Sequence, residues 1–103
     1  MQVRWLGSAL ADLEAIQDYL IEKNPPAAYR LVGRIRNAVA RLLEMPNRGR
    51  PGRWPGTLEL VIPGTPYIVP YRVRGDAIEI LRVWHGARRW PARPPQPPVR
   101  PRP

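Results

Sequence analysis

The first half of the chain contains two stretches with apolar residues at helical spacing. The first stretch follows Ser8, a favourable N-cap residue. Its apolar residues recur every three or four positions, at Leu10, Leu13, Ile16 and Leu20. Asn24-Pro25-Pro26 should end this helix and begin a second one before Pro46, because proline is well tolerated in a first helical turn. A break this short predicts an antiparallel helical hairpin.

The second predicted helix carries two different stripes. Its apolar stripe consists of Ala28, Leu31, Ile35, Ala38 or Val39, and Leu42. Its basic residues Arg30, Arg34 and Arg41 lie on another stripe. We therefore expect this helix to bury one face and to present arginines on a second face.

Short segments typical of β-strands surround the predicted hairpin. Residues 2–6 precede it, and residues 57–62 follow it with clear period-2 alternation. Residues 67–73 form another strand, in which Pro70 lacks a backbone N–H and so suggests a bulge or an edge position. Residues 77–84 are apolar on both faces, which favours a central strand. The order β-α-α-β-β-β predicts an α+β fold, with the hairpin on one face of a mostly antiparallel sheet.

A change in composition near residue 91 predicts the domain boundary. We place one domain at residues 1–91 and an extended, mobile Pro/Arg-rich tail at residues 92–103. The segment 47–56, NRGRPGRWPG, has the composition of a loop. The N-terminus lacks the apolar core of a signal peptide, and no apolar run approaches the ~20 residues of a membrane span. We therefore expect a cytoplasmic protein with no membrane partner.

The charge is large and unevenly distributed. The net charge is +9, and sixteen of the seventeen basic residues are arginine. Residues 46–103 hold eleven arginines against three acidic residues, whereas residues 1–45 are almost balanced. Arginine binds phosphate and carboxylate in a bidentate manner, so the excess suggests a nucleic acid or an acidic protein as partner. A GC-rich genome would explain the choice of arginine over lysine but not the asymmetry.

The absence of cysteine and the single histidine limit the possible chemistry. Disulfides and thiolate catalysis are excluded, and a zinc site is not expected. We predict no metal and no cofactor.

The basic loop offers candidate contacts to a target. Residues 48–51, RGRP, match the core of minor-groove AT hooks. A broader interpretation makes Arg48, Arg50 and Arg53 a phosphate-binding rim beside Trp54, whose indole would stack on a base. The alternative is a solvated loop in which Trp54 closes the edge of the core. The full set of candidate target-binding residues is Arg48, Arg50, Arg53, Trp54, Arg72 and Arg89.

The only histidine follows the last predicted strand and raises the question of RNA cleavage. Cleavage by the 2′-hydroxyl needs a base, an acid and a cation near the phosphate. His85 and Glu59 could exchange the protons, and Arg82 or Arg88 could supply the charge. The alternatives are structural: Glu59 would pair with an arginine of a neighbouring strand, and His85 would pack or cap the backbone.

The order of elements and several local motifs resemble the RelE/ParE superfamily of toxins from bacterial type II toxin–antitoxin systems, also labelled plasmid-stabilisation proteins. The similarity covers about residues 3–91. It rests on Ala11-Asp12-Leu13, Asn24-Pro25, Gly49-Arg50, Gly56-Thr57 with Glu59-Leu60-Val61, Tyr67-Ile68-Val69, Tyr71-Arg72-Val73, Ile80-Leu81-Arg82-Val83 and His85-Gly86-Ala87-Arg88.

The resemblance implies a growth-inhibiting toxin that a cognate antitoxin neutralises, with a toxin–antitoxin hetero-oligomer as one arrangement. The wrapping segment of such antitoxins is usually acidic and apolar, which suits a basic toxin. The superfamily contains RelE-like toxins, which cut mRNA on the ribosome, and ParE-like toxins, which poison DNA gyrase.

The RNase residues of RelE are only partly matched. Leu60, Ile62 and Ile68 occupy the places of two lysines and an arginine, and only Arg88 fits a later arginine. This favours the ParE-like function. A ribosome-dependent endoribonuclease using His85 and Glu59 is the alternative, and a basic nucleic-acid-binding module is a third hypothesis. Leu58 stands where relatives usually have arginine, which predicts weakened activity that Leu58→Arg would restore.

Overall fold

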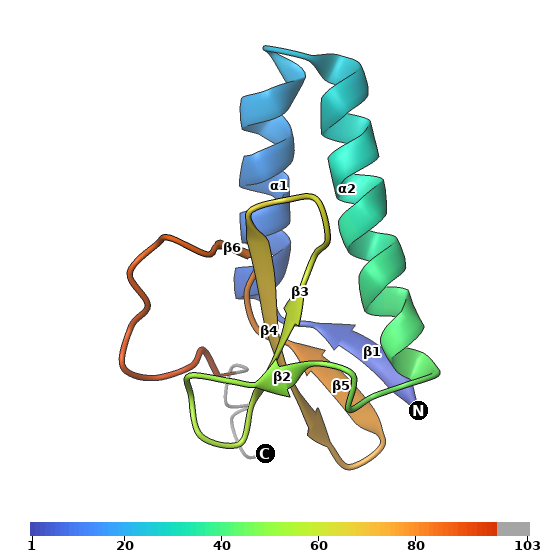
Figure 1. Cartoon of the computed structure of the whole chain (residues 1–103), viewed down its shortest axis with the longest axis vertical. Helices are drawn as coiled ribbons and strands as arrows, with labels where there is room; N and C mark the ends of the chain where they lie inside the picture. The colour runs from blue at the N-terminus through green and yellow to red at the C-terminus, as the bar shows by residue number, and fades with distance from the viewer. Residues whose placement is uncertain (97–103) are drawn as a thin grey trace, which may run out of the picture.

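The structure, a computed structural model, describes residues 1–96 as two helices that stand side by side above a sheet (Figure 1). The helices are α1 (Gly7–Ile21) and α2 (Pro25–Ala40), and a short 3-10 turn, η1 (Arg41–Leu43), extends α2. Between the helices, the Asn24 side chain accepts a hydrogen bond from the Ala27 N–H at 3.2 Å. The predicted hairpin and its break at Asn24 are thus confirmed.

The sheet is mixed, with the N-terminal strand in its parallel pair. Its longer strands are β1 (Gln2–Trp5), β3 (Leu58–Val61), β4 (Tyr67–Arg74) and β5 (Ala77–Ile80). Two short strands, β2 (Arg50–Pro51) and β6 (Trp84–His85), complete it. The order is β1-β5-β4-β3-β2, and β6 pairs with β4. Only β1 and β5 are parallel among the described pairs. The predicted α+β architecture is confirmed, while β2 was not expected inside the predicted loop.

Ser8 does not cap the first helix, which corrects the sequence prediction. The N-cap position is Leu6, whose backbone N–H still bonds to the carbonyl of Ile80 at 3.0 Å. The chain therefore passes from β1 into α1 without a side-chain cap. The Ser8 hydroxyl instead donates to the Leu81 carbonyl at 2.7 Å and ties the start of α1 to the sheet.

Pro70 lies in a central strand, so of the two positions suggested by the sequence the edge is wrong, whereas the bulge matches the register: residues 81–83 lie opposite residues 69–70 of β4. β4 has β3 on one side and β5 and β6 on the other. Leu81 donates its N–H to the Pro70 carbonyl at 2.9 Å. Pro70 has no N–H that could donate to the Leu81 carbonyl in exchange. The Leu81 carbonyl accepts from Ser8 instead, and the predicted strand 77–84 is interrupted between β5 and β6 at this point.

The two faces of the sheet cover different clusters. The main core lies under the helices; at its centre are the fully buried side chains Ile35, Leu42, Ile62, Tyr71, Ile78 and Ile80. The opposite face carries a second cluster of Leu6, Trp54, Leu81 and Trp84, with Trp90 packed against it. The segment that follows β6 contributes Trp90, so it crosses this second face.

Residues near the predicted tail contact the domain. The Trp54 indole donates to the Pro91 carbonyl at 2.7 Å, and Arg72 donates to the Gln96 side chain at 3.2 Å. The boundary at residue 91 remains a prediction, and residues 97–103 of the predicted tail lie outside the described residues. None of the helices in the described part of the chain is both long and apolar enough to cross a membrane.

Candidate functional site

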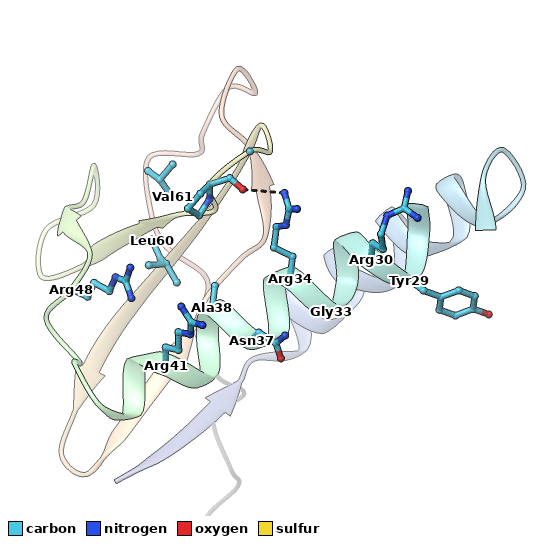
Figure 2. Close-up of a pocket in the computed structure, with 12 residues that line it drawn as sticks. Tyr29, Arg30, Gly33, Arg34, Asn37, Ala38, Arg41, Arg48, Leu60 and Val61 are labelled. Carbon is cyan, nitrogen blue, oxygen red and sulfur yellow. Dashed lines mark hydrogen bonds between the residues drawn. The ribbon is translucent and has the colours of Figure 1, made fainter. Parts of the chain in front are cut away.

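A groove of about 790 Å³ runs between α2 and β3. Its floor includes Ala38, Leu60 and Pro63, and four arginines surround it: Arg30, Arg34, Arg41 and Arg48 (Figure 2). The first three follow one stripe of the α2–η1 helical segment, as their spacing predicts, and Arg48 enters from the loop before β2. The groove therefore combines an apolar base with a basic rim.

The four groove arginines have no acidic partner within the described residues. None of them has a carboxylate oxygen within 4.0 Å, and no aspartate or glutamate lines the groove. Arg34 makes one contact, from Nη1 to the Pro63 carbonyl at 3.3 Å, which leaves its other nitrogens available. These guanidinium groups can therefore bind carboxylates or phosphates of a partner.

Glu59 is a structural ion-pair residue. Its side chain is 2% exposed, and one carboxylate oxygen accepts from Nε and Nη2 of Arg50 at 3.3 and 3.2 Å. The other oxygen accepts the backbone N–H of Arg53 at 2.8 Å, and Nε of Arg53 lies 3.9 Å away. This geometry matches the salt-bridge interpretation of Glu59. Through their contacts with Glu59, Arg50 and Arg53 stabilise the loop to which they belong.

The RGRP segment is therefore not a free arm. Arg50 and Pro51 form β2, paired with Glu59 and Leu58. An AT hook needs both arginines to lie along a narrow groove of DNA, whereas here Arg50 is bound to Glu59. This geometry argues against the minor-groove interpretation.

Arg72 lies in the interior rather than on the expected binding surface. Its guanidinium bonds to the Glu79 carboxylate at 2.6 Å, and both side chains are less than one tenth exposed. Arg74 lies 3.8 Å from the same carboxylate. Because a buried charge must be compensated, we assign Arg72 a structural role.

Arg82 is held by Asp12 from α1. Nε and Nη2 of Arg82 donate to the two carboxylate oxygens at 2.6 and 2.7 Å, and the Val83 N–H donates to Asp12 at 3.0 Å. The guanidinium groups of Arg82 and Arg88 lie 4.2 and 4.8 Å from the centre of the Trp84 ring. Asp12 was noted only as part of a motif, because its partner lies 70 residues away in the sequence.

Trp54 is only 3% exposed. Its ring packs against Trp84 and Trp90 with centroids 6.1 and 5.0 Å apart, and Arg53 lies 4.2 Å from the centre of the Trp90 ring. The indole has no free face for stacking on a base. This burial matches the alternative in which Trp54 closes the edge of the core. Of the predicted target-binding residues, only Arg48 and Arg89 are exposed without a carboxylate partner among the described residues.

His85 is exposed, and its Nδ1 atom accepts the Ala87 N–H at 3.2 Å. A neutral imidazole that accepts at Nδ1 carries its proton on Nε2. In that tautomer the outward Nε2 of the neutral ring is a hydrogen-bond donor. The ring also meets Tyr67 edge-on at 6.0 Å between centroids. These contacts match the backbone-capping and packing alternative for His85, and its catalytic role stays a prediction.

The side chains of Glu59 and His85 point to opposite faces of the sheet. Glu59 is opposite Pro70 on the β3 side of β4, and His85 is opposite Tyr67 on the β6 side. Directly paired residues point to the same face, and faces alternate along a strand. Pro70 and Tyr67 are three positions apart, so Glu59 and His85 point to opposite faces. They cannot act together on one phosphate.

Two further observations concern Leu58 and metal binding. Leu58, where the resemblance leads one to expect arginine, packs partly buried against the main core. Among the described residues, no group of three His, Cys, Asp or Glu side chains has a geometry that could hold a metal ion.

Known proteins with similar sequences and structures are toxins. A family model described as the ParE toxin of the type II toxin-antitoxin system parDE matches residues 3–90. The chain is 47% identical over 90 residues to the putative toxin Y4kP of Sinorhizobium fredii, covering 87% of this chain and 93% of that protein. It is 40% identical over 87 residues to toxin RelE2 of Caulobacter vibrioides, covering 84% and 97%.

A solved structure agrees with these relatives. A chain of the chromosomal ParDE TA system from P. aeruginosa superposes with a TM-score of 0.75 at 36% identity, covering 81% of this chain and 92% of that one. Fold, family match and relatives agree with the resemblance in the motifs. This chain belongs to the ParE toxin family, within the RelE/ParE toxins of type II toxin–antitoxin systems.

Proposed function

We propose that this toxin inhibits growth by poisoning DNA gyrase and not by cutting RNA. The observation that carries the proposal is the separation of Glu59 and His85 onto opposite faces of the sheet. Arg82, one of the two candidate cations, is bound to Asp12 through Nε and Nη2. Within the described residues, Glu59, His85 and Arg82 therefore do not supply a base, an acid and a free cation at one place. A poison that acts by binding needs no such arrangement.

The second candidate function is a ribosome-dependent endoribonuclease. It is favoured by the exposure of His85, whose Nε2 remains free in the described structure, and by the exposed Arg88 three residues later. In this function the ribosome would have to supply the missing base. Both targets are cytoplasmic, and we propose the same location for the toxin.

We further propose that a cognate antitoxin docks in the groove between α2 and β3. A type II antitoxin must cover its toxin, and the ParDE structure is described as a toxin–antitoxin system. The groove offers apolar side chains at its base and, at its rim, four arginines that have no acidic partner among residues 1–96. The partner that fits both features is an amphipathic acidic segment. The other clustered arginines, such as Arg50 and Arg72, are already paired within the toxin.

His85→Ala should preserve growth inhibition. We expect the surviving colony count after induction to stay within about threefold of the wild-type count, because removing a general acid or base costs about 10²–10⁴-fold where one operates. Immunoblots would equalise toxin levels, and circular dichroism would check that the purified variant is folded. A folded His85→Ala protein that no longer stops growth would contradict the gyrase proposal and support the endoribonuclease.

A further inference from the structure

The loop that carries Arg48 into the groove is held by a buried tyrosine of the sheet. The Tyr71 hydroxyl donates to the Pro46 carbonyl at 2.8 Å and accepts the Gly49 N–H at 2.8 Å. Tyr71 belongs to the central strand β4 and is 0% exposed. Its two partners lie on either side of Arg48 in the chain. A single side chain therefore fixes both ends of the segment 46–49.

The fit between Tyr71 and this segment is close. A Cβ atom at Gly49 would lie 2.8 Å from the Tyr71 hydroxyl and 2.9 Å from the Glu59 carbonyl, closer than real contacts allow. Burial raises the pKa of Tyr71 above its ordinary value of 10.0, and the opposing effect of the Gly49 N–H is smaller. The hydroxyl therefore stays protonated at neutral pH and can donate to Pro46.

Arg48 depends on this support more than the other groove arginines do. Arg30 and Arg34 project from the regular helix α2, and Arg41 from its 3-10 extension. Arg48 lies in a loop and is exposed; its backbone N–H bonds to Met45 at 3.1 Å. Figure 2 shows it reaching the groove from the loop, while Arg41 reaches it from the helical side. Without an anchor, the loop would lose the geometry that places this guanidinium at the rim.

We infer that Tyr71 is a positioning residue for antitoxin binding: it holds Arg48 at the groove without touching the partner. The inference rests on the proposed docking of the antitoxin in the groove. Pre-ordering a contact residue lowers the entropy that must be lost on binding. The hydroxyl should therefore contribute to affinity only through Arg48.

A double-mutant cycle tests this inference, with the purified cognate antitoxin as probe, to be sought as a small acidic protein encoded beside the toxin gene. We expect Arg48→Ala and Tyr71→Phe each to weaken binding about tenfold. The double variant should bind about as weakly as Arg48→Ala alone. Tyr67→Phe is the matched control: it lies on the same strand, and its hydroxyl makes no hydrogen bond within the described residues. It should change affinity less than about twofold.

The outcomes separate the two proposals. If Arg48→Ala leaves affinity unchanged, the groove is not the docking site and both proposals fail. If Arg48→Ala weakens binding but Tyr71→Phe has no effect, or the two losses multiply, the groove stands and the positioning role is wrong. Gly49→Ala displaces the same segment without removing the hydroxyl and should reproduce the loss. Thermal unfolding would confirm that each variant is folded at the binding temperature.

Discussion

Arg30→Glu combined with Arg41→Glu is expected to weaken antitoxin binding by about a hundredfold or more. Both arginines line the groove and have no carboxylate partner among the described residues. The change removes two bidentate donors and places like charges opposite an acidic partner, which costs several kcal/mol in an interface. Fluorescence anisotropy with the labelled cognate antitoxin would measure the dissociation constant.

The matched control changes the net charge equally at another surface. Arg89 and Arg93 are exposed, lie outside the groove and have no carboxylate partner in the described part of the chain. Arg89→Glu with Arg93→Glu should change the dissociation constant less than about threefold at physiological salt, where distant charges are screened. Equal losses in both double variants would show that net charge, and not the groove, attracts the antitoxin.

Glu79→Ala should reduce the free energy of unfolding by about 3–5 kcal/mol. Glu79 accepts a hydrogen bond from Arg72 at 2.6 Å, both side chains are buried, and Arg72 also donates to the side chain of Gln96. Removing the carboxylate leaves a buried guanidinium without its counter-charge. For a domain of this size that loss is a large part of the total stability. Urea unfolding followed by tryptophan fluorescence would measure it.

Two comparisons identify the cause of that loss. The double variant Arg72→Met with Glu79→Leu should recover most of the stability, because apolar side chains replace a buried pair with little cost. Arg50→Ala removes an ion pair whose arginine is about half exposed, so it should cost no more than about 1 kcal/mol. A loss below about 1 kcal/mol for Glu79→Ala would mean that Arg72 reaches solvent or another partner.

The fold was largely predictable because its local patterns agree with its tertiary structure. The apolar stripe at Ile35 and Leu42 and the proline-marked start of α2 depend only on neighbours in sequence. The edge alternative for Pro70 was wrong because a proline normally avoids a central strand. Here Pro70 lies at the point along β4 where the neighbouring strand changes from β5 to β6. The Leu81 carbonyl, which receives no N–H from Pro70, accepts a hydrogen bond from the Ser8 hydroxyl. That compensation comes from α1 and leaves no local sequence signal.

The site was less predictable because it depends on which charges are already paired. In the sequence, Glu59 is a lone carboxylate that could be either a general base or an ion-pair partner. The structure matches the ion pair, with Arg50 and Arg53 as partners. Nothing local to Arg82 indicates that Asp12 would bind it. The groove itself forms only when α2 is placed beside β3 and the loop at Arg48. Composition indicates an acidic partner, but only tertiary structure separates the unpaired arginines from the paired ones.

The most direct test of the central claim is to map chromosomal DNA breaks and transcript ends in the same cells after toxin induction. Poisoning of gyrase predicts gyrase-linked double-strand breaks with transcripts that remain intact, for wild-type toxin and His85→Ala alike. Transcripts cut at ribosome-occupied codons, without DNA breaks and only when His85 is present, would contradict the account.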